Sequence, residues 1–130
     1  MRRLPDRLPP RTLCHFDIRD DNLLIRPDGT AAVIDWGMAR LGPVWVDPLL
    51  LALQQGTGSA VRLVTSLPPA EQETAVDFLT AFAGSQAWNA RQPARPGLPH
   101  FAAFCADDVT RLLAAAHALL RWPDRLADGS

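Results

Sequence analysis

The chain has 130 residues, of which 48% are hydrophobic and 21% charged, and its formal net charge is −1. These values are typical of an ordinary globular protein, and they exclude a strongly basic surface that binds nucleic acid or membranes. No apolar run approaches a membrane span, and the N-terminal charges lack the apolar segment of a signal peptide. Cys14 and Cys105 form neither a disulfide nor a zinc pattern, so we expect a reduced, cytoplasmic location.

The first part of the chain predicts short strands. Residues 1–11 contain three prolines and four arginines and are expected to form an irregular lead-in. The apolar run at residues 12–16 is typical of a short strand. Two further apolar runs flank the turn sequence Pro-Asp-Gly at residues 27–29, which predicts a β-hairpin.

The second part of the chain predicts helices. Asp47 is expected to be the N-cap, and Pro48 the first residue, of a helix that ends at a flexible connector near residues 56–59. A second helix should begin near residues 67–73, and a proline-rich connector should span residues 90–99. The buried stripe of this second helix is predicted to contain Val76, Leu79, Phe82 and Ala83.

A last helix is predicted over roughly residues 100–121, stopped by Pro123. Its expected apolar side consists of Phe101, Phe104, Cys105, Leu112, Leu113, Ala116, Leu119 and Leu120. The fold class is therefore α+β and mostly helical, in a single domain over residues 1–130. After the lead-in, residues 12–46 would carry the site loops and residues 47–130 a helical subdomain.

Two motifs carry the chemistry. His15, Asp17 and Asn22 form the pattern H-x-D-x-x-x-x-N in the loop before the hairpin, and Asp35 opens D-x-G at the end of its second strand. The hairpin can therefore bring Asp35 back beside Asn22. Two carboxylates and an amide oxygen would then surround one small volume, and such oxygen ligands suit Mg²⁺.

The two motifs resemble the catalytic and metal loops of protein kinases. In detail they are similar to those of the aminoglycoside phosphotransferase family, kinase-like enzymes that phosphorylate small molecules. That family commonly has H-G-D-x-x-x-x-N followed by a hydrophobic residue, and then I-D-W or I-D-F. The stretches CHFDIRDDNLLI (14–25) and AVIDWG (32–37) match these patterns, with Phe16 in place of the usual Gly. The segment GPVWVDPLLLAL (42–53) also resembles the family's next segment.

The resemblance implies a protein-kinase-like C-terminal lobe whose small hairpin carries both loops. It implies an enzyme that moves the γ-phosphate of ATP, or of GTP, to a hydroxyl of a small molecule. Asp17 would be the catalytic base, and Asn22 and Asp35 would bind Mg²⁺ and, through it, the nucleotide.

Three further residues take expected roles from the same resemblance. His15 would fix the catalytic loop by hydrogen bonds, and Arg19 would clamp phosphate oxygens. Trp36 would border the nucleotide or the metal. Asp20 and Asp21 would suit a cationic acceptor, although the acceptor itself stays open.

The family's N-lobe supplies a glycine-rich loop and a Lys that hold the nucleotide phosphates. The chain contains no Lys, and only 14 residues precede His15. We therefore expect the N-lobe to be absent, the chain to be partial, and its activity alone to be low. The face that meets an N-lobe, with Val33 or Trp36 near it, would be exposed, so the chain would associate with itself or with a partner that supplies the lobe.

Two alternatives remain open at this point. One is a non-catalytic remnant or binding module that keeps affinity for Mg²⁺ and nucleotide without transfer, in line with the missing Lys. The other is a Mg²⁺-dependent phosphohydrolase that uses Asp17 and Asp35 as metal ligands, which would release phosphate without any acceptor.

Overall fold

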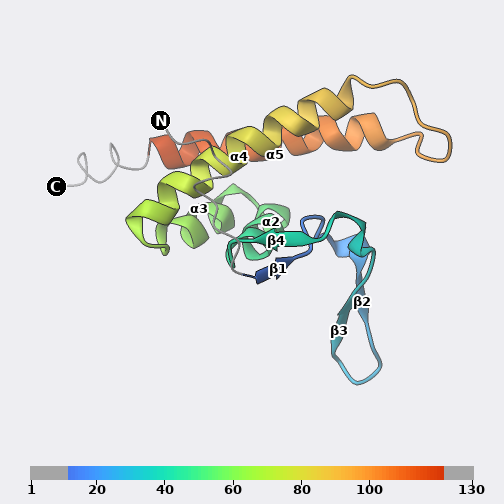
Figure 1. The fold of residues 1–130 in the computed structure, drawn as a ribbon, viewed down its shortest axis with the longest axis horizontal. Coiled ribbons are helices and arrows are strands. Elements are labelled where there is room, and N and C mark those ends of the chain that lie inside the picture. Colours follow the sequence, from blue (N-terminus) through green and yellow to red (C-terminus); the bar gives the residue numbers. More distant parts are fainter. Residues whose placement is uncertain (1–11, 122–130) are drawn as a thin grey trace. The chain divides into compact units, whose positions relative to one another are not determined.

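The computed structural model describes residues 12–121. The chain divides into two compact units, residues 1–63 and residues 64–130, which are treated separately below. Its described residues are α+β and mostly helical, as predicted, with four α-helices and two two-stranded sheets (Figure 1). The predicted lead-in at residues 1–11 and the stop at Pro123 lie outside the described residues, and the single domain stays a prediction.

Two antiparallel strand pairs form the first part of unit 1. Strand β1 (Thr12–Cys14) pairs with β4 (Arg40–Gly42), and β2 (Leu23–Ile25) pairs with β3 (Ala31–Val33). The strand predicted at residues 12–16 is thus shorter, because the chain leaves the sheet to form the first motif. Strand β4 was not predicted, since three residues with a single large apolar side chain show no alternation.

The turn between β2 and β3 has the chemistry expected of a three-residue hairpin loop. Arg26 N–H donates to the Thr30 carbonyl at 2.8 Å, and Gly29 N–H donates to the Arg26 carbonyl at 2.9 Å. Gly29 has a φ of +83°, which closes the loop without the strain that a side chain would bring. The Asp28 carboxylate accepts hydrogen bonds from the Thr30 hydroxyl (2.7 Å) and N–H (2.9 Å), and these bonds lower the pKa of Asp28.

Two helices complete unit 1. Helix α2 (Val46–Gln55) ends at Gly56, and α3 (Thr57–Thr65) begins at the next residue and ends just past the unit boundary. The prediction of a flexible connector at residues 56–59 was therefore wrong. Gly56, at φ +119° and ψ 164°, makes the whole turn by itself, in a backbone region that is essentially restricted to Gly. The composition suggested a linker, but α3 is stabilised by buried side chains, namely Ala60, Val61 and Val64.

Unit 2 is an antiparallel pair of long helices, α4 (Pro69–Ala90) and α5 (Phe101–Leu120), which pack side by side (Figure 1). Pro69 is the first residue of α4, where its missing N–H costs nothing. The buried apolar side chains of the pair are Ala75, Phe78, Leu79, Ala83, Cys105, Leu112, Ala115, Ala116 and Leu119.

The predicted stripes of these helices were right in part. In α4 the predicted Leu79 and Ala83 are buried, whereas Val76 and Phe82 are only partly buried. In α5 the predicted Cys105, Leu112, Ala116 and Leu119 are buried, and Phe101 and Phe104 are partly buried. Leu113 and Leu120 are exposed, since each lies one residue, about 100° of helix rotation, beyond a buried leucine.

A polar bridge joins α4 and α5 within their largely apolar interface. The buried Gln86 donates from Nε2 to the Asp108 carboxylate at 2.9 Å and accepts from Asn89 Nδ2 at 3.2 Å. Asp108 also pairs with Arg111 at 3.5 Å. Because a buried amide must keep its partners, this bridge fixes the register of the two helices. No helix within residues 12–121 is long and apolar enough to span a membrane.

The link between α2 and α3 gives a testable expectation for Gly56. A Cβ at this position would meet no atom within 4 Å, so backbone strain alone decides the outcome of Gly56→Ala. We expect this variant to lower the free energy of unfolding by about 1–3 kcal/mol, measured by urea denaturation. Gly58→Ala is the matched control, because Gly58 lies inside α3 and its substitution should leave stability unchanged or raise it. Equal effects of the two changes would contradict the assignment.

Candidate functional site

The first motif forms a closed loop after β1. Asn22, at the end of the short 3₁₀ helix η1 (Asp20–Asn22), is buried. Its side-chain nitrogen donates to the backbone carbonyl of Asp17 at 2.8 Å and to the Asp17 carboxylate at 3.2 Å. The sequence motif therefore brings the two residues into direct contact. Because the Asn22 nitrogen is engaged, its side-chain oxygen is the atom that remains for another ligand.

His15 connects this loop to the second motif. The ring is buried, and its Nδ1 accepts a hydrogen bond from Asp17 N–H at 3.2 Å. On the other side of the ring, Nε2 donates to the Ile34 carbonyl at 2.7 Å. Ile34 N–H in turn donates to the Asn22 carbonyl at 3.0 Å. Two hydrogen bonds thus attach the residue just before Asp35 to the Asp17 loop.

The second motif turns sharply at Asp35. This residue has a φ of +59°, in the left-handed region, and its side chain is exposed at the start of the 3₁₀ helix η2 (Trp36–Met38). Trp36 is half exposed; its indole N–H donates to the Val33 carbonyl at 2.9 Å, and its ring meets the His15 ring edge-on at 4.8 Å. The left-handed conformation of Asp35 ends the extended backbone of the preceding strand and begins η2.

Asp17 lies in an environment that favours its protonated form. Burial raises the pKa of Asp17, and the positive charge of Arg19 and the hydrogen bond from Asn22 offset this only in part. The Arg19 Nε atom lies 3.5 Å from the Asp17 carboxylate and 3.0 Å from that of Asp21. Arg19 is therefore placed beside the expected catalytic carboxylate, and Asp21 helps to hold it there.

Asp47 has a role that the sequence did not predict. Helix α2 begins at Val46, so Asp47 lies inside the first turn and is not the N-cap, and Pro48 is not the first helical residue. The Asp47 carboxylate accepts hydrogen bonds from His15 N–H at 2.6 Å and Phe16 N–H at 2.9 Å. Asp47 thus satisfies two backbone donors of the Asp17 loop instead of those of its own helix.

Phe16 occupies the position where the family commonly has Gly, and its φ is +63°. A side chain in this conformation is strained. The Phe16 ring packs against Gly42, where an added Cβ would lie 3.1 Å from a ring carbon. Arg40 lies on β4, and its guanidinium is 5.1 Å from the centroid of the Phe16 ring. Ring packing and the cation–π contact offset the strain, and they tie the loop to the β1–β4 sheet.

Cys14 is buried directly before His15. Its Sγ donates to the Pro43 carbonyl at 3.3 Å. Burial and the nearby negative charge of Asp47 raise the pKa of the Cys14 thiol. The thiol is therefore kept in its protonated form beside the loop.

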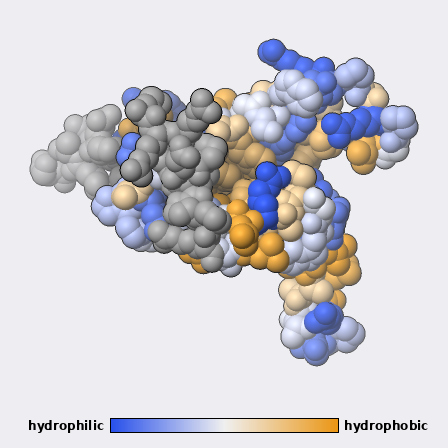
Figure 2. Space-filling model, viewed as in Figure 1, coloured by the Kyte–Doolittle hydropathy of each residue, from blue (hydrophilic) through white to orange (hydrophobic). Residues whose placement is uncertain are grey.

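An apolar surface surrounds these loops in unit 1. Figure 2 shows hydrophobic side chains on the hairpin above its hydrophilic tip. Trp36 is 48% exposed, as expected, whereas Val33 is partly buried. Among residues 12–63, the exposed large apolar side chains are Leu13, Leu24, Ile25, Ile34, Trp36, Met38, Leu41 and Val44.

The model of the phosphotransferase enzyme family (APH) matches residues 1–65, half of the chain. The chain belongs to this family. Membership of the aminoglycoside phosphotransferase type, inferred from the two motifs, is thereby confirmed, and the matched residues contain both motifs and end with α3. No curated protein and no solved structure gives a significant match to the chain.

The donor atoms of this phosphotransferase-family chain fit a magnesium ion. The Asn22 side-chain oxygen and the exposed Asp35 carboxylate are oxygen donors of the kind that Mg²⁺ takes, since this ion commonly binds one or two protein oxygens and completes its shell with water and phosphate. Among residues 12–121, no three His, Cys, Asp or Glu side chains gather into a metal-binding group.

The Asp47 anchor predicts a local effect of Asp47→Asn. An amide cannot provide two charged acceptor oxygens, so we expect the His15 and Phe16 N–H groups to lose protection. Their amide hydrogen exchange should become about tenfold faster or more, which corresponds to about 1.5–3 kcal/mol for a hydrogen bond to a charged group. The matched control is Asp107→Asn, an exposed acid in α5, which should leave both amides unchanged. Unchanged exchange in Asp47→Asn would rule the anchor out.

Proposed function

We propose that this chain is the catalytic part of a small-molecule kinase, which moves the γ-phosphate of ATP or GTP to an acceptor hydroxyl. The observation that carries the proposal is the His15 bridge. Through it and the Ile34–Asn22 hydrogen bond, the Asp17 loop and the Asp35 loop are joined as neighbours. Family membership supports phosphotransfer as the reaction class. We further propose that the chain acts in the cytoplasm.

In this proposal Asp17 accepts the proton of the acceptor hydroxyl. Its raised pKa makes its carboxylate a stronger base, and the hydrogen bond from Asn22 orients it. Arg19, which lies within 3.5 Å of the Asp17 carboxylate, is placed to bind phosphate oxygens with its planar fork. We propose that the class of acceptor molecules includes cationic compounds, because Asp20 and Asp21 add exposed negative charge close to Asp17 in the chain.

We assign the metal and nucleotide side of the site to three residues. Asn22 and Asp35 would hold Mg²⁺, and Trp36 would border the nucleotide. A magnesium ion at these oxygens would supply positive charge beside the donor phosphates, which is the main requirement of phosphoryl transfer. The hydrogen bonds from the His15 ring to the Ile34 carbonyl and from Ile34 N–H to the Asn22 carbonyl would keep the two ligands at a fixed separation.

A second candidate function follows from the composition. The 130 residues contain no Lys, so they offer no lysine side chain to pair with the donor phosphates. A non-catalytic module that binds Mg²⁺ and nucleotide fits this observation. We therefore expect the rate of transfer by the chain alone to fall far below the roughly 1–100 s⁻¹ of kinases.

We propose that a second copy of the chain, or a partner that supplies the donor clamp, packs against the exposed apolar side chains of unit 1.

The metal assignment can be tested without turnover. With ATP and Mn²⁺ in place of Mg²⁺, we expect paramagnetic broadening of the amide resonances of Asp17, Asn22 and Asp35. Asp35→Asn should remove this broadening, because it removes the charged ligand, whereas Asp107→Asn should retain it. Broadening that is centred elsewhere, or that persists in Asp35→Asn, would contradict the assignment.

Asp17→Asn separates the catalytic role from folding. Because the pKa of Asp17 is raised above 3.8, its contribution to stability is present at low pH and is lost as the pH rises through the raised value. At pH 7 the charge is a net cost, so Asp17→Asn should match or exceed the parent chain in urea denaturation. Acceptor-stimulated ADP release should fall at least about 100-fold. Nucleotide binding with equal, background ADP release in both chains would favour the binding module instead.

A further inference from the structure

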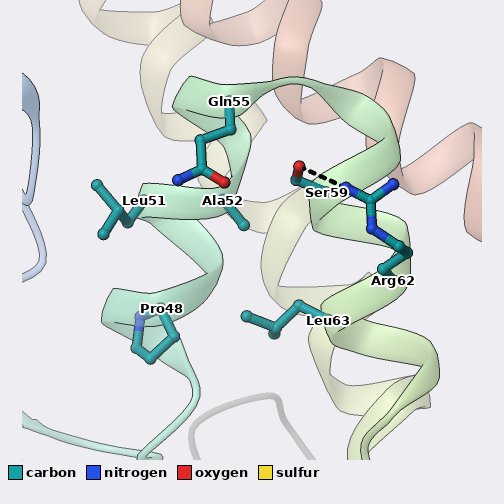
Figure 3. Close-up of a pocket in the computed structure, with 7 residues that line it drawn as sticks. All are labelled: Pro48, Leu51, Ala52, Gln55, Ser59, Arg62 and Leu63. Atoms are coloured by element: carbon teal, nitrogen blue, oxygen red, sulfur yellow. Dashed lines mark hydrogen bonds between the residues drawn. The ribbon is translucent and has the colours of Figure 1, made fainter.

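Hollows outside the two motif loops differ in how far their arginine is engaged. A hollow of about 320 Å³ lies between α2 and α3, and its arginine, Arg62, donates from Nη2 to the Ser59 hydroxyl at 2.9 Å (Figure 3). A smaller hollow, of about 60 Å³, lies in unit 2 beside the connector from α4 to α5, residues 91–100 (Figure 1). The guanidinium of its arginine, Arg95, makes no hydrogen bond or ion pair within residues 12–121. The smaller hollow therefore contains an arginine that is available to a ligand.

The connector holds Arg95 in a defined turn. Leu98 N–H donates to the Arg95 carbonyl at 3.0 Å, which closes a β-turn. Pro96 and Gly97 are its central residues, and Gly97 has a φ of +79°, as a type II turn requires at that position. Phe101 N–H then donates to the Leu98 carbonyl at 3.2 Å, which attaches the start of α5 to the turn. The wall of the hollow is thus formed before a ligand binds, which lowers the entropy cost of binding.

Three side chains that bear nitrogen donors line the hollow. The Arg95 guanidinium lies 4.9 Å from the centroid of the Phe101 ring, and this cation–π contact holds it without using any of its N–H groups. Asn89 and Gln92 each use one side-chain N–H on an acceptor of α4, at 3.2 Å and 3.0 Å, and each amide nitrogen carries a second N–H. None of the described residues that line the hollow is acidic. This donor set suits an anion.

The charge along this part of the chain also favours an anion. Residues 78–106 contain Arg91 and Arg95 but neither Asp nor Glu, although the whole chain has 14 acids and 13 bases. The next acids along the chain are Asp107 and Asp108, in the second turn of α5, and Asp108 is already held in the polar bridge between the helices. The connector therefore carries positive charge with no acid close to it in the sequence.

The size and surroundings of the hollow select a carboxylate next to an apolar group. A volume of about 60 Å³ is twice the roughly 30 Å³ that one water molecule occupies in the liquid, so it suits a group with two oxygen atoms. A carboxylate is planar and binds an arginine fork through two parallel hydrogen bonds. Leu98 lines the hollow and is 51% exposed, and Trp88, in the last turn of α4, is 62% exposed. Apolar groups beside the bound carboxylate would cover these two side chains.

We propose that the hollow at the connector end of unit 2 binds an acidic side chain of a partner protein, in a segment where Glu or Asp adjoins an apolar residue. Arg95 and the two amides would bind the carboxylate, and the apolar neighbour would pack against Leu98 and Trp88. Every residue of this site belongs to unit 2, so the proposal does not depend on the proposed phosphotransfer function. The peptide acetyl-Ala-Glu-Leu-Glu-Ala-amide is a probe of this chemistry.

The test is a titration of the full chain with this peptide, followed by amide chemical shifts. We expect saturable shifts centred on residues 88–102, and at least about tenfold weaker binding of the same peptide with Gln in place of Glu. Arg95→Gln should weaken the peptide about tenfold, and Arg95→Lys should have an intermediate affinity, because it keeps the charge but loses the fork. Arg95 is exposed, so the urea midpoint of Arg95→Gln should equal that of the parent chain.

Arg91→Gln is the matched control. Arg91 is exposed in the same connector but does not line the hollow, so its loss should change the affinity less than about twofold.

Four results would overturn the proposal. Equal binding of the Glu and Gln peptides would remove the role of the carboxylate. Equal losses in Arg95→Gln and Arg91→Gln would show that diffuse charge, and not the hollow, attracts the peptide. Glutarate that binds as tightly as the peptide would identify a free acid as the ligand, in place of a partner segment. Short single-stranded DNA that shifts the same amides at lower concentration would identify a nucleic acid.

Discussion

The His15 imidazole is the connection on which the site depends. Both ring nitrogens are used, one accepting from Asp17 N–H and the other donating to the Ile34 carbonyl, and the ring is buried. Behind it, the Asp47 carboxylate holds the backbone of the same loop. The relative position of the two motifs is thus set largely by backbone groups. The carboxylates of Asp17 and Asp35 are left with exposed surface, as groups that must meet a ligand require.

The local parts of this site could be predicted from the sequence. The turn chemistry of Pro27-Asp28-Gly29 predicted the hairpin, and the hairpin predicted that Asp35 returns toward Asn22. The structure places Ile34, the neighbour of Asp35, in a hydrogen bond with Asn22. These features span few residues, so turn type and strand alternation are enough to determine them. The chemical roles of the residues stay predictions.

The parts that depend on distant contacts could not be predicted. A lone Asp before a Pro is typical of a helix cap, and only the fold shows that Asp47 bonds to a loop 31 and 32 residues earlier. Strand β4 exists because β1 is available as its partner, and α3 exists because its apolar side chains are buried. Phe16 at a positive φ is a similar case: without Gly42 and Arg40 around its ring, the sequence alone argues against that conformation.

The buried thiols have a practical consequence. Cys14 and Cys105 are the two cysteines of the chain, and both are buried. The raised pKa of Cys14 further reduces its thiolate fraction, and the thiolate is the reactive form. A cysteine introduced at the hairpin tip would therefore be the preferred target of a maleimide dye or spin label. The native sequence can serve as its own background for distance measurements, with neither cysteine replaced.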